Sequence, residues 1–226
     1  MHIGPLLGSG RTADVFALDD AWVLRRYRND TDATTELAVL SYLSASGFAV
    51  PRIGPPAGGA LPTDLVMQRL SGPTLSEALL AGTLTGAQGA DLLARLLREL
   101  HAIPPRISQD PGDRILHLDL HPENVMMTPH GAVVIDWNTA AEGPPALDRA
   151  MSSLILAQLA LAPGPFPGEL VSGLLSDLMS CLDTDGGVPA DALATATARR
   201  AADPGLTARE TAVLDDAAAL VASLAG

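Results

Sequence analysis

The segment of residues 115–138 constrains this chain more than any other, because it places polar residues at fixed spacing between apolar runs. It reads ILHLDLHPENVMMTPHGAVVIDWN. Its first half contains an H-x-D-x-x-x-x-N loop, and the apolar run 132–135 predicts a buried strand with an acid at its tip. The polar residues concerned are His117, Asp119, Asn124 and Asp136.

The turn residues Thr128 to Gly131 separate the loop from the strand and predict a hairpin. Such a hairpin brings Asn124 and Asp136 close together beside Asp119. Two oxygen ligands for Mg²⁺ next to a carboxylate are what phosphoryl transfer to a hydroxyl requires. Each residue alone also fits a structural role, as a turn cap, a turn residue or a strand end. The combination favours phosphate chemistry.

These motifs carry a resemblance to a known family. The run from His117 to Asn124, followed by Asp136 and Trp137, is similar to the catalytic and metal-binding segments of the aminoglycoside phosphotransferase and choline-kinase-like family. Members of that family are distant relatives of protein kinases. The resemblance implies that Asp119 orients or deprotonates the acceptor hydroxyl, and that Asn124 and Asp136 hold Mg²⁺.

His121 stands where protein kinases usually carry Lys. As a catalytic residue it could approach the γ-phosphate of a bound nucleotide, or it could hold the loop by hydrogen bonds; both roles stay open. His117 is interpreted as an organiser of the loop backbone. Asn138 occupies a position where relatives often have an acidic residue or Gly, which leaves the metal ligand Asp136 in place.

The resemblance implies an α+β, two-lobed protein-kinase-like fold with a small β-rich N-lobe and a mainly helical C-lobe. The N-terminal nucleotide-binding lobe is expected to span residues 1–70, with a hinge at 67–72. The helical C-terminal lobe would span residues 73–226. It would carry the catalytic loop 117–124 together with the metal-binding Asp136.

Gly8, Ser9 and Gly10 lie between two short apolar runs near the N-terminus. Glycines let a backbone approach phosphates closely, so this segment is a candidate nucleotide-covering loop. Its place ahead of Asp119 fits the order of such loops in kinases. A plain β-turn is equally compatible with the pattern, and Ala13 replaces the third glycine of the protein-kinase loop.

The chain contains no Lys, and all 14 of its basic residues are Arg. An arginine must therefore replace the Lys that contacts phosphate in kinases, and the resemblance places Arg25, on an expected strand 21–27, at that position. Glu36 falls on the apolar side of an expected helix from Asp30 to Ala45, where a carboxylate needs a cation such as Arg25. That apolar side is formed by Leu37, Leu40 and Leu43. Solvated strand charges and a first-turn Glu favoured by the helix dipole are the alternatives.

Gln68 and Leu70 lie in a strand and linker expected over residues 65–72. The resemblance places the hinge here, so that backbone groups from Gln68 to Leu70 would meet the purine base of ATP or GTP. An ordinary strand end would give the same pattern.

The remainder of the chain is mostly helical. A leucine stripe in residues 92–100 predicts a buried helix face, and His101 closes that helix as a structural histidine. Asp148 is expected to support the catalytic loop through capping or hydrogen bonds rather than through chemistry. Three or four further helices are expected at residues 146–161, 168–182, 190–201 and 207–224.

Composition limits the partners of the chain. The formal net charge is −12, which leaves no basic stripe for a nucleic acid. The acidity would favour a cationic acceptor, although it is also an ordinary aid to solubility. A single cysteine, Cys181, and the lack of a signal segment indicate the cytoplasm. The longest apolar stretch, residues 154–162, is too short to span a membrane.

The expected function is therefore that of a small-molecule kinase. With Mg²⁺, the γ-phosphoryl group of ATP or GTP would pass to a hydroxyl of an aminoglycoside, another antibiotic, or a metabolite such as choline, homoserine or a sugar. The alternative is a regulatory protein that binds nucleotide without turnover, as the missing Lys would allow. The complete set of Asp119, Asn124 and Asp136 argues against that alternative.

Overall fold

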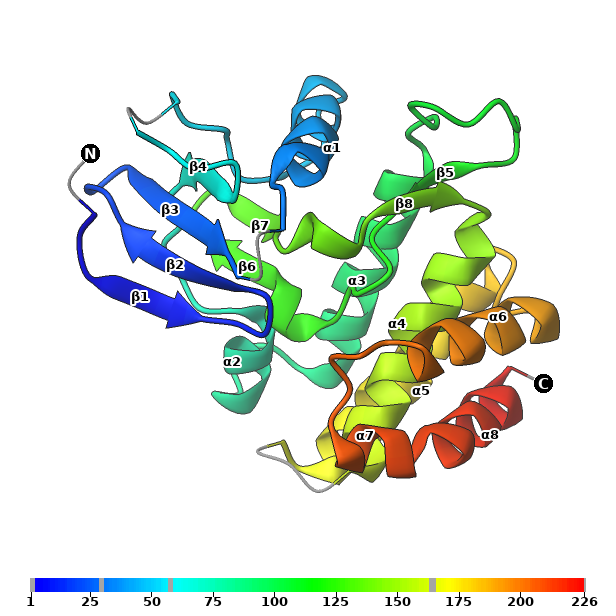
Figure 1. The fold of residues 1–226 in the computed structure, drawn as a ribbon. Helices are drawn as coiled ribbons and strands as arrows, with labels where there is room; N and C mark the ends of the chain where they lie inside the picture. The colour runs from blue at the N-terminus through cyan, green and yellow to red at the C-terminus, as the bar shows by residue number, and fades with distance from the viewer. Residues whose placement is uncertain (1–2, 29–30, 57–58, 163–165, 226) are drawn as a thin grey trace. The chain divides into compact units, whose positions relative to one another are not determined.

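The computed structural model describes residues 3–28, 31–56, 59–162 and 166–225. Its contacts divide the chain into two compact units (Figure 1). The first unit comprises residues 1–72 together with 126–138, and the second comprises residues 73–125 together with 139–226. We describe each unit by itself.

The first unit is built on a four-stranded antiparallel sheet whose strands follow one another in chain order (Figure 1). The strands are β1 (Leu6–Ser9), β2 (Ala13–Ala17), β3 (Trp22–Tyr27) and β4 (Asp64–Gln68). Side chains alternate along β3, so Arg25 is buried whereas Arg26 turns to the other face and pairs with Asp64 through two hydrogen bonds of 2.7 and 2.8 Å. Only one of the two adjacent arginines therefore points inward, and it is Arg25, the residue that the resemblance placed at the Lys position.

Helix α1 (Thr34–Ala45) buries Glu36, Val39, Leu40 and Leu43. Leu37 was expected in the apolar stripe, but its side chain is exposed; Val39 takes its place because it falls on the buried side of the helix. Asp30, where we expected the helix to start, lies outside the described residues. The helix ends before Gly47, whose φ of 81° suits a residue without a Cβ.

The hairpin of β6 (Val125–Thr128) and β7 (Gly131–Val134) forms a separate two-stranded sheet. Its contacts place residues 126–138 with the first unit, whereas the sequence reading assigned Asp136 to the helical lobe. The cause is local packing: the Val134 N–H donates to the carbonyl of Ala49 at 3.0 Å, and the Trp137 ring meets Phe48 edge to face at 5.8 Å between centroids.

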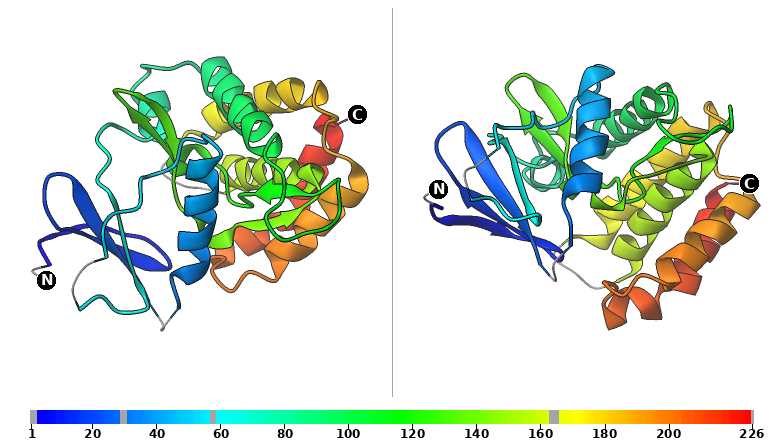
Figure 2. Two further views of the ribbon diagram at one scale, coloured as in Figure 1. Left: turned by 90° about the horizontal axis from the view of Figure 1, so that it is seen from above. Right: turned by 45° about the horizontal axis from the view of Figure 1, so that its top comes forward.

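The second unit is mainly helical. Its helices are α2 (Leu75–Leu80), α3 (Gly86–His101), α4 (Pro145–Leu161), α5 (Gly168–Asp183), α6 (Ala190–Ala201), α7 (Ala208–Ala212) and α8 (Leu214–Leu224). Capping boxes begin α2 at Thr74 and α3 at Thr85. Helix α4 lies at the centre, packed against α5, α6 and α8, as the different views agree (Figures 1 and 2).

The single helix expected at 207–224 is divided into α7 and α8 at Val213. A continuous helix would give the carbonyl of Glu210 to the N–H four residues later. That carbonyl instead accepts a hydrogen bond of 2.8 Å from Gln158 Nε2 of α4. A tertiary contact therefore occupies the Glu210 carbonyl, which a continuous helix would use for its own hydrogen bonding.

A pair of short strands and a 3₁₀ turn complete the second unit. Strands β5 (Arg114–Leu116) and β8 (Ala141–Gly143) pair antiparallel, and the 3₁₀ turn, η1 (Pro122–Asn124), forms the end of the predicted catalytic loop. A second 3₁₀ turn, η2 (Trp137–Thr139), follows Asp136. Across the described residues, no helix is long and apolar enough to cross a membrane.

Candidate active site

The backbone of the predicted catalytic loop is turned sharply just before Asp119. Leu118 has a φ of 63°, a left-handed conformation that an L-residue adopts only when its surroundings hold it there. The N–H of Asp119 then donates to Nδ1 of His117 at 3.2 Å. His117 thus organises the loop backbone through its ring.

A buried carboxylate, Asp148 of α4, holds this turn by accepting hydrogen bonds from its backbone. Its Oδ1 accepts the N–H of Leu118 at 2.7 Å, and its Oδ2 accepts the N–H of His117 at 2.9 Å and lies 3.0 Å from His101 Nε2. Asp148 is fully buried, and burial alone would raise its pKa. The hydrogen bond and charge of His101, with the backbone donors, outweigh burial and hold the pKa below its ordinary value.

Asp119, Asn124 and His121 meet within the loop. Asn124 Nδ2 donates to the Asp119 carbonyl at 2.8 Å and to its Oδ2 at 3.2 Å. His121 Nε2 lies 3.2 Å from Asn124 Nδ2 and 3.8 Å from Asp119 Oδ2. The structure therefore brings Asp119, the predicted base, into one cluster with Asn124, a predicted metal ligand, and with His121, whose role the sequence left open.

Asp119 is ionised at neutral pH. Burial opposes its charge, but the neighbouring His121, with Nε2 3.8 Å from Oδ2, followed by the charges of His117 and Arg200, outweighs burial and lowers the pKa of Asp119 below its ordinary value. A charged carboxylate can orient a hydroxyl and accept its proton. The contribution of Arg200, on α6, could not be anticipated from the sequence.

In the first unit, Arg25 and Glu36 form the pair that the sequence predicts, with Arg25 NH1 3.4 Å from Glu36 Oε1. Arg25 also makes a contact that the sequence did not predict: its NH2 donates to Asp136 Oδ1 at 2.5 Å. The guanidinium further lies 5.0 Å from the centre of the Tyr27 ring. Arg25 thus contacts both Glu36, which was expected to help position phosphates, and Asp136, the expected metal ligand.

Glu36 is saturated by three neighbours. The Tyr27 hydroxyl donates to its Oε2, and Oε1 accepts the N–H of Trp137 at 3.1 Å in addition to the contact with Arg25. Burial raises the pKa of Glu36, against the opposing effect of Arg25. Tyr27 was not among the predicted site residues. Its place two residues after Arg25 on β3, on the same face, is the signal that could have found it.

Asp136 has a φ of 66°, and among the described residues it and Leu118 are the two non-glycine residues with positive φ. Such backbone strain is held by surrounding contacts and is common at functional sites. The Asp136 side chain keeps 34% of its surface exposed, so one oxygen is engaged by Arg25 while the carboxylate remains accessible. Accessible oxygen is a requirement for a metal ligand.

The predicted metal ligands, Asn124 and Asp136, fall in different units. The donor types fit a magnesium ion, since both supply hard oxygen atoms. Asn124 turns its Nδ2 toward Asp119, which leaves its Oδ1 for another partner. No group of three or more His, Cys, Asp or Glu side chains that could hold a metal is found in the part of the chain that the structure describes.

Gly8 and Ser9 are the last residues of β1, and Gly10 begins the turn to β2, which a 2.9 Å hydrogen bond from Gly10 N to Ala13 O closes. Arg28, which sequence reasoning missed, holds the turn: its NH1 donates to the Gly10 carbonyl at 3.0 Å and its NH2 to Ser9 Oγ at 2.5 Å. A Cβ added at Gly8 would meet nothing within 4 Å. The turn is therefore ordered by polar contacts rather than by steric need for glycine.

Gln68 and Leu70 lie at and just beyond the end of β4. The Gln68 side chain accepts a hydrogen bond of 3.1 Å from Arg52 Nε, and its backbone N–H donates to the Arg52 carbonyl at 2.8 Å. The backbone N–H of Arg69 donates to Ala21 at 2.8 Å. Leu70 belongs to no strand or helix.

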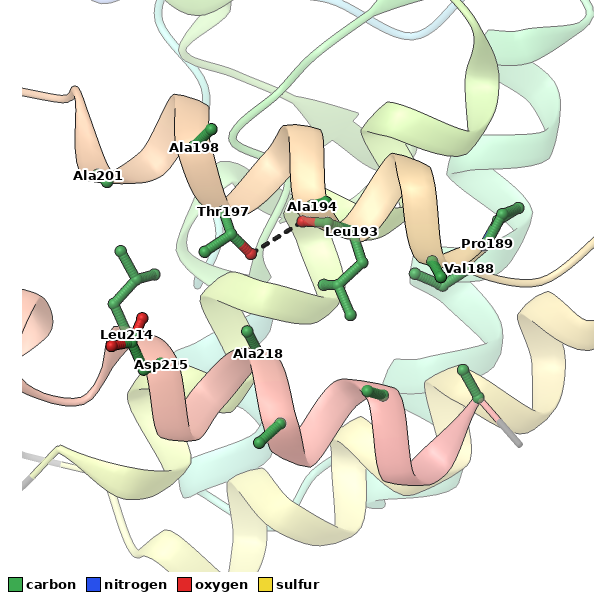
Figure 3. A pocket seen from close by; sticks show the side chains of 14 residues that line it. Val188, Pro189, Leu193, Ala194, Thr197, Ala198, Ala201, Leu214, Asp215 and Ala218 are labelled. Carbon is green, nitrogen blue, oxygen red and sulfur yellow. Dashed lines mark hydrogen bonds between the residues drawn. The ribbon is translucent and has the colours of Figure 1, made fainter.

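A groove with a volume of about 870 Å³ runs between α6 and α8 (Figure 3). Its lining is mainly alanine, with Leu193, Thr197, Leu214 and Asp215 among the larger side chains. None of the predicted site residues lines it, so the groove does not belong to the candidate active site.

The sequence matches the family model described as the phosphotransferase enzyme family, over residues 4–115 and 108–190. The chain belongs to this family. This membership confirms the resemblance carried by the catalytic segment, and it identifies the chain as an enzyme of the kinase-like phosphotransferases. A search of curated protein sequences gave no significant match.

Solved structures share the fold at low sequence identity. The ternary complex of APH(2")-IIa with streptomycin and ATP has a TM-score of 0.59 and 13% identity, covering 88% of this chain and 83% of that one. Amicoumacin kinase hAmiN, in complex with AMP-PNP, Ca²⁺ and Ami, has a TM-score of 0.56 and 15% identity, covering 98% and 88%. A choline/ethanolamine kinase family protein from Mesorhizobium loti has a TM-score of 0.56 and 17% identity, covering 98% and 88%. The predicted α+β, kinase-like fold class is confirmed.

Proposed function

We propose that this phosphotransferase moves the γ-phosphoryl group of a nucleoside triphosphate to a hydroxyl of a small molecule. The observation that carries the proposal is the environment of the Arg25 side chain. Its guanidinium is buried, it is paired with Glu36, and its Nε has no hydrogen-bond partner among the described residues. A buried donor without a partner is costly, and a phosphate oxygen is the acceptor that suits an arginine best.

The roles of the loop residues follow from their chemistry. Asp119, ionised and held by Asn124, would orient the acceptor hydroxyl and take its proton. Asn124 and Asp136 would hold Mg²⁺, which when bound neutralises charge on the phosphates. His121 would assist by keeping Asp119 and Asn124 in position.

The remaining predicted residues would bind the nucleotide. Gly8, Ser9 and Gly10 would cover the phosphates with the turn that Arg28 orders. Backbone groups between Gln68 and Leu70 would meet the purine of ATP or GTP, since the Gln68 side chain is already engaged by Arg52.

The acceptor we propose is a cationic antibiotic of the aminoglycoside type. Two of the similar structures contain streptomycin and amicoumacin, and the formal net charge of −12 on this chain favours a cation. Choline, homoserine or a sugar are the other candidates, and one similar structure is from the choline/ethanolamine kinase family.

A regulatory protein that binds nucleotide without turnover is the second candidate function, favoured by the arginine that replaces Lys at position 25. The two functions differ in one measurable respect. A kinase phosphorylates an acceptor, whereas a regulatory protein only binds nucleotide in a Mg²⁺-dependent manner.

The test is a panel of hydroxyl acceptors incubated with the purified chain, Mg²⁺, and either ATP or GTP, with the mass of each acceptor recorded. The panel contains aminoglycosides, amicoumacin, choline, ethanolamine, homoserine and common sugars. We expect one class to gain the mass of a phosphoryl group, and the Asp119→Asn variant to lose that gain. Nucleotide binding with no mass gain in any acceptor would contradict the kinase and support the regulatory protein.

A further inference from the structure

The cluster around Arg25 contains a residue that neither the family resemblance nor the proposed function uses. Tyr27 follows Arg25 by two positions on β3, so both side chains lie on the same face of the sheet. Only 5% of Tyr27 is exposed, against 7% of Arg25 and 3% of Glu36. The tyrosine ring lies against the Arg25 guanidinium, and the tyrosine hydroxyl binds the carboxylate that Arg25 also binds.

Arginine differs from the lysine of other kinases in one respect that matters here. Its guanidinium is a planar fork, and a carboxylate with both oxygens free captures such a fork through two parallel hydrogen bonds. An arginine held in this way by Glu36 would have fewer donors left for a phosphate. A lysine offers a compact charge without this geometry and does not face the problem.

The contacts of Glu36 show how that capture is avoided. Oε2 is occupied by the Tyr27 hydroxyl, and Oε1 is shared between the N–H of Trp137 and Arg25 NH1, the latter at 3.4 Å. The closest approach of Arg25 to Glu36 is therefore long, and Glu36 does not hold the guanidinium through two close parallel hydrogen bonds. Its NH2 reaches Asp136, and its buried Nε has no partner among the described residues.

We propose that Tyr27 is a positioning residue that makes an arginine usable in place of lysine: by occupying one oxygen of Glu36 and supporting the guanidinium plane, it keeps the donors of Arg25 available for nucleotide phosphates. The inference rests on the proposed function, because it concerns the nucleotide that this function requires. It adds a residue whose effect is exerted through Glu36 and Arg25, without contact with the phosphate.

The test is a double-mutant cycle of Tyr27→Phe and Arg25→Lys. Phenylalanine retains the ring and removes only the hydroxyl, so the packing of β3 is preserved. The dissociation constants of MgATP and MgGTP are measured by calorimetry for the wild type, the two single variants and the double variant, and thermal unfolding of each variant reports its folding.

In the arginine background, we expect Tyr27→Phe to weaken binding of the preferred nucleotide by about tenfold, the size of a lost hydrogen bond to a charged group. In the Arg25→Lys background, the same substitution should change the dissociation constant less than twofold, because lysine cannot be captured as a fork. Once an acceptor is identified, Tyr27→Phe should raise the KM for nucleotide and leave kcat at saturation nearly unchanged. Tyr42→Phe, at the only other tyrosine, is the matched control and should leave binding unchanged.

Equal weakening in both backgrounds would overturn the inference, since a purely structural tyrosine does not distinguish arginine from lysine. Unchanged binding in Tyr27→Phe would overturn it as well, while leaving the proposed function intact. A wild-type chain that binds neither nucleotide would overturn the proposed function and the inference together. A crystal structure of the Tyr27→Phe variant adds an independent check, because both oxygens of Glu36 should then contact Arg25.

Discussion

At the scale of single residues, carboxylates in this chain are distinguished by what surrounds them. Asp148 is fully buried and accepts backbone donors, Asp119 is held by an amide and a histidine, and Asp136 pairs with Arg25 while keeping part of its surface exposed. These differences are compatible with the supporting role expected of the first, the catalytic role proposed for the second and the ligand role proposed for the third.

Replacing Asp119 by Asn should lower kcat by a factor of roughly 10² to 10⁴, the usual contribution of a positioned acid or base. The amide keeps the shape of the side chain but cannot accept a proton. Steady-state rates with the acceptor identified from the panel provide the measurement, and Asp216→Asn on the exposed face of α8 is the control. A kcat within twofold of wild type would remove Asp119 from the mechanism.

Asp148 should make stability depend on pH in the acid range. Its folded-state pKa is lower than the ordinary value of 3.8, so as pH falls the unfolded chain binds a proton first. The stabilisation is then complete above about pH 4 and is lost below it.

The free energy of unfolding in urea, measured from pH 3 to pH 6 for wild type and Asp148→Asn, tests this dependence. We expect the wild-type advantage to be constant above about pH 4 and to shrink below that value. Because other carboxylates titrate equally in both proteins, only the difference between them is informative. A difference that stays constant down to pH 3 would show that Asp148 does not titrate as inferred.

At the scale of elements, the segment after β4 depends on a glycine. Gly72 has a φ of 127°, and a Cβ added there would stand 2.1 Å from the carbonyl oxygen of Met127 in β6. Both the backbone conformation and the close approach exclude a side chain. The passage from the sheet to the helical unit therefore requires glycine at this position.

Gly72→Ala should lower the free energy of unfolding by about 3 kcal/mol or more, because strain in the positive-φ region adds to a clash with backbone. Gly82→Ala is the matched control: Gly82 also has a positive φ, of 66°, but nothing lies within 4 Å of an added Cβ. Its cost should be about 1 kcal/mol. Urea unfolding of both variants makes the comparison, and equal costs would refute the role of the Met127 contact.

Helix α3 illustrates how far an element can be read from its sequence. Its leucine stripe is buried as predicted, because the 3.6-residue period places those side chains on one face whatever they pack against. Helix α1 is less regular, and Leu37 was assigned to the wrong side. The division between α7 and α8 could not be read at all, since it depends on Gln158 in a distant part of the sequence.

At the scale of the whole molecule, ligand binding should stabilise the fold by mass action. A nucleotide at 100 times its dissociation constant adds about 2.7 kcal/mol to the free energy of unfolding. We therefore expect thermal unfolding to shift upward with ATP or GTP in the presence of Mg²⁺, and the shift to fall when EDTA removes the metal.

Arg25→Met should abolish this shift, because it removes the cation proposed to meet the phosphates. Scanning calorimetry with and without nucleotide gives the result, and Arg95→Met, on the exposed face of α3, is the control. A shift of equal size in Arg25→Met would place the nucleotide elsewhere.

The sequence by itself determined the family and the class of fold, and it predicted the loop that we propose to be catalytic. Loop spacing was sufficient because Asp119, His121 and Asn124 are neighbours in the chain, so a short turn brings them together without help from distant segments. Only the tertiary structure decided that Arg25 is shared between Glu36 and Asp136, and that the Tyr27 hydroxyl occupies Oε2 of Glu36. The physical reason is that the residues after β7 are far in sequence from β3 and α1 and meet them only through packing, which no local pattern records.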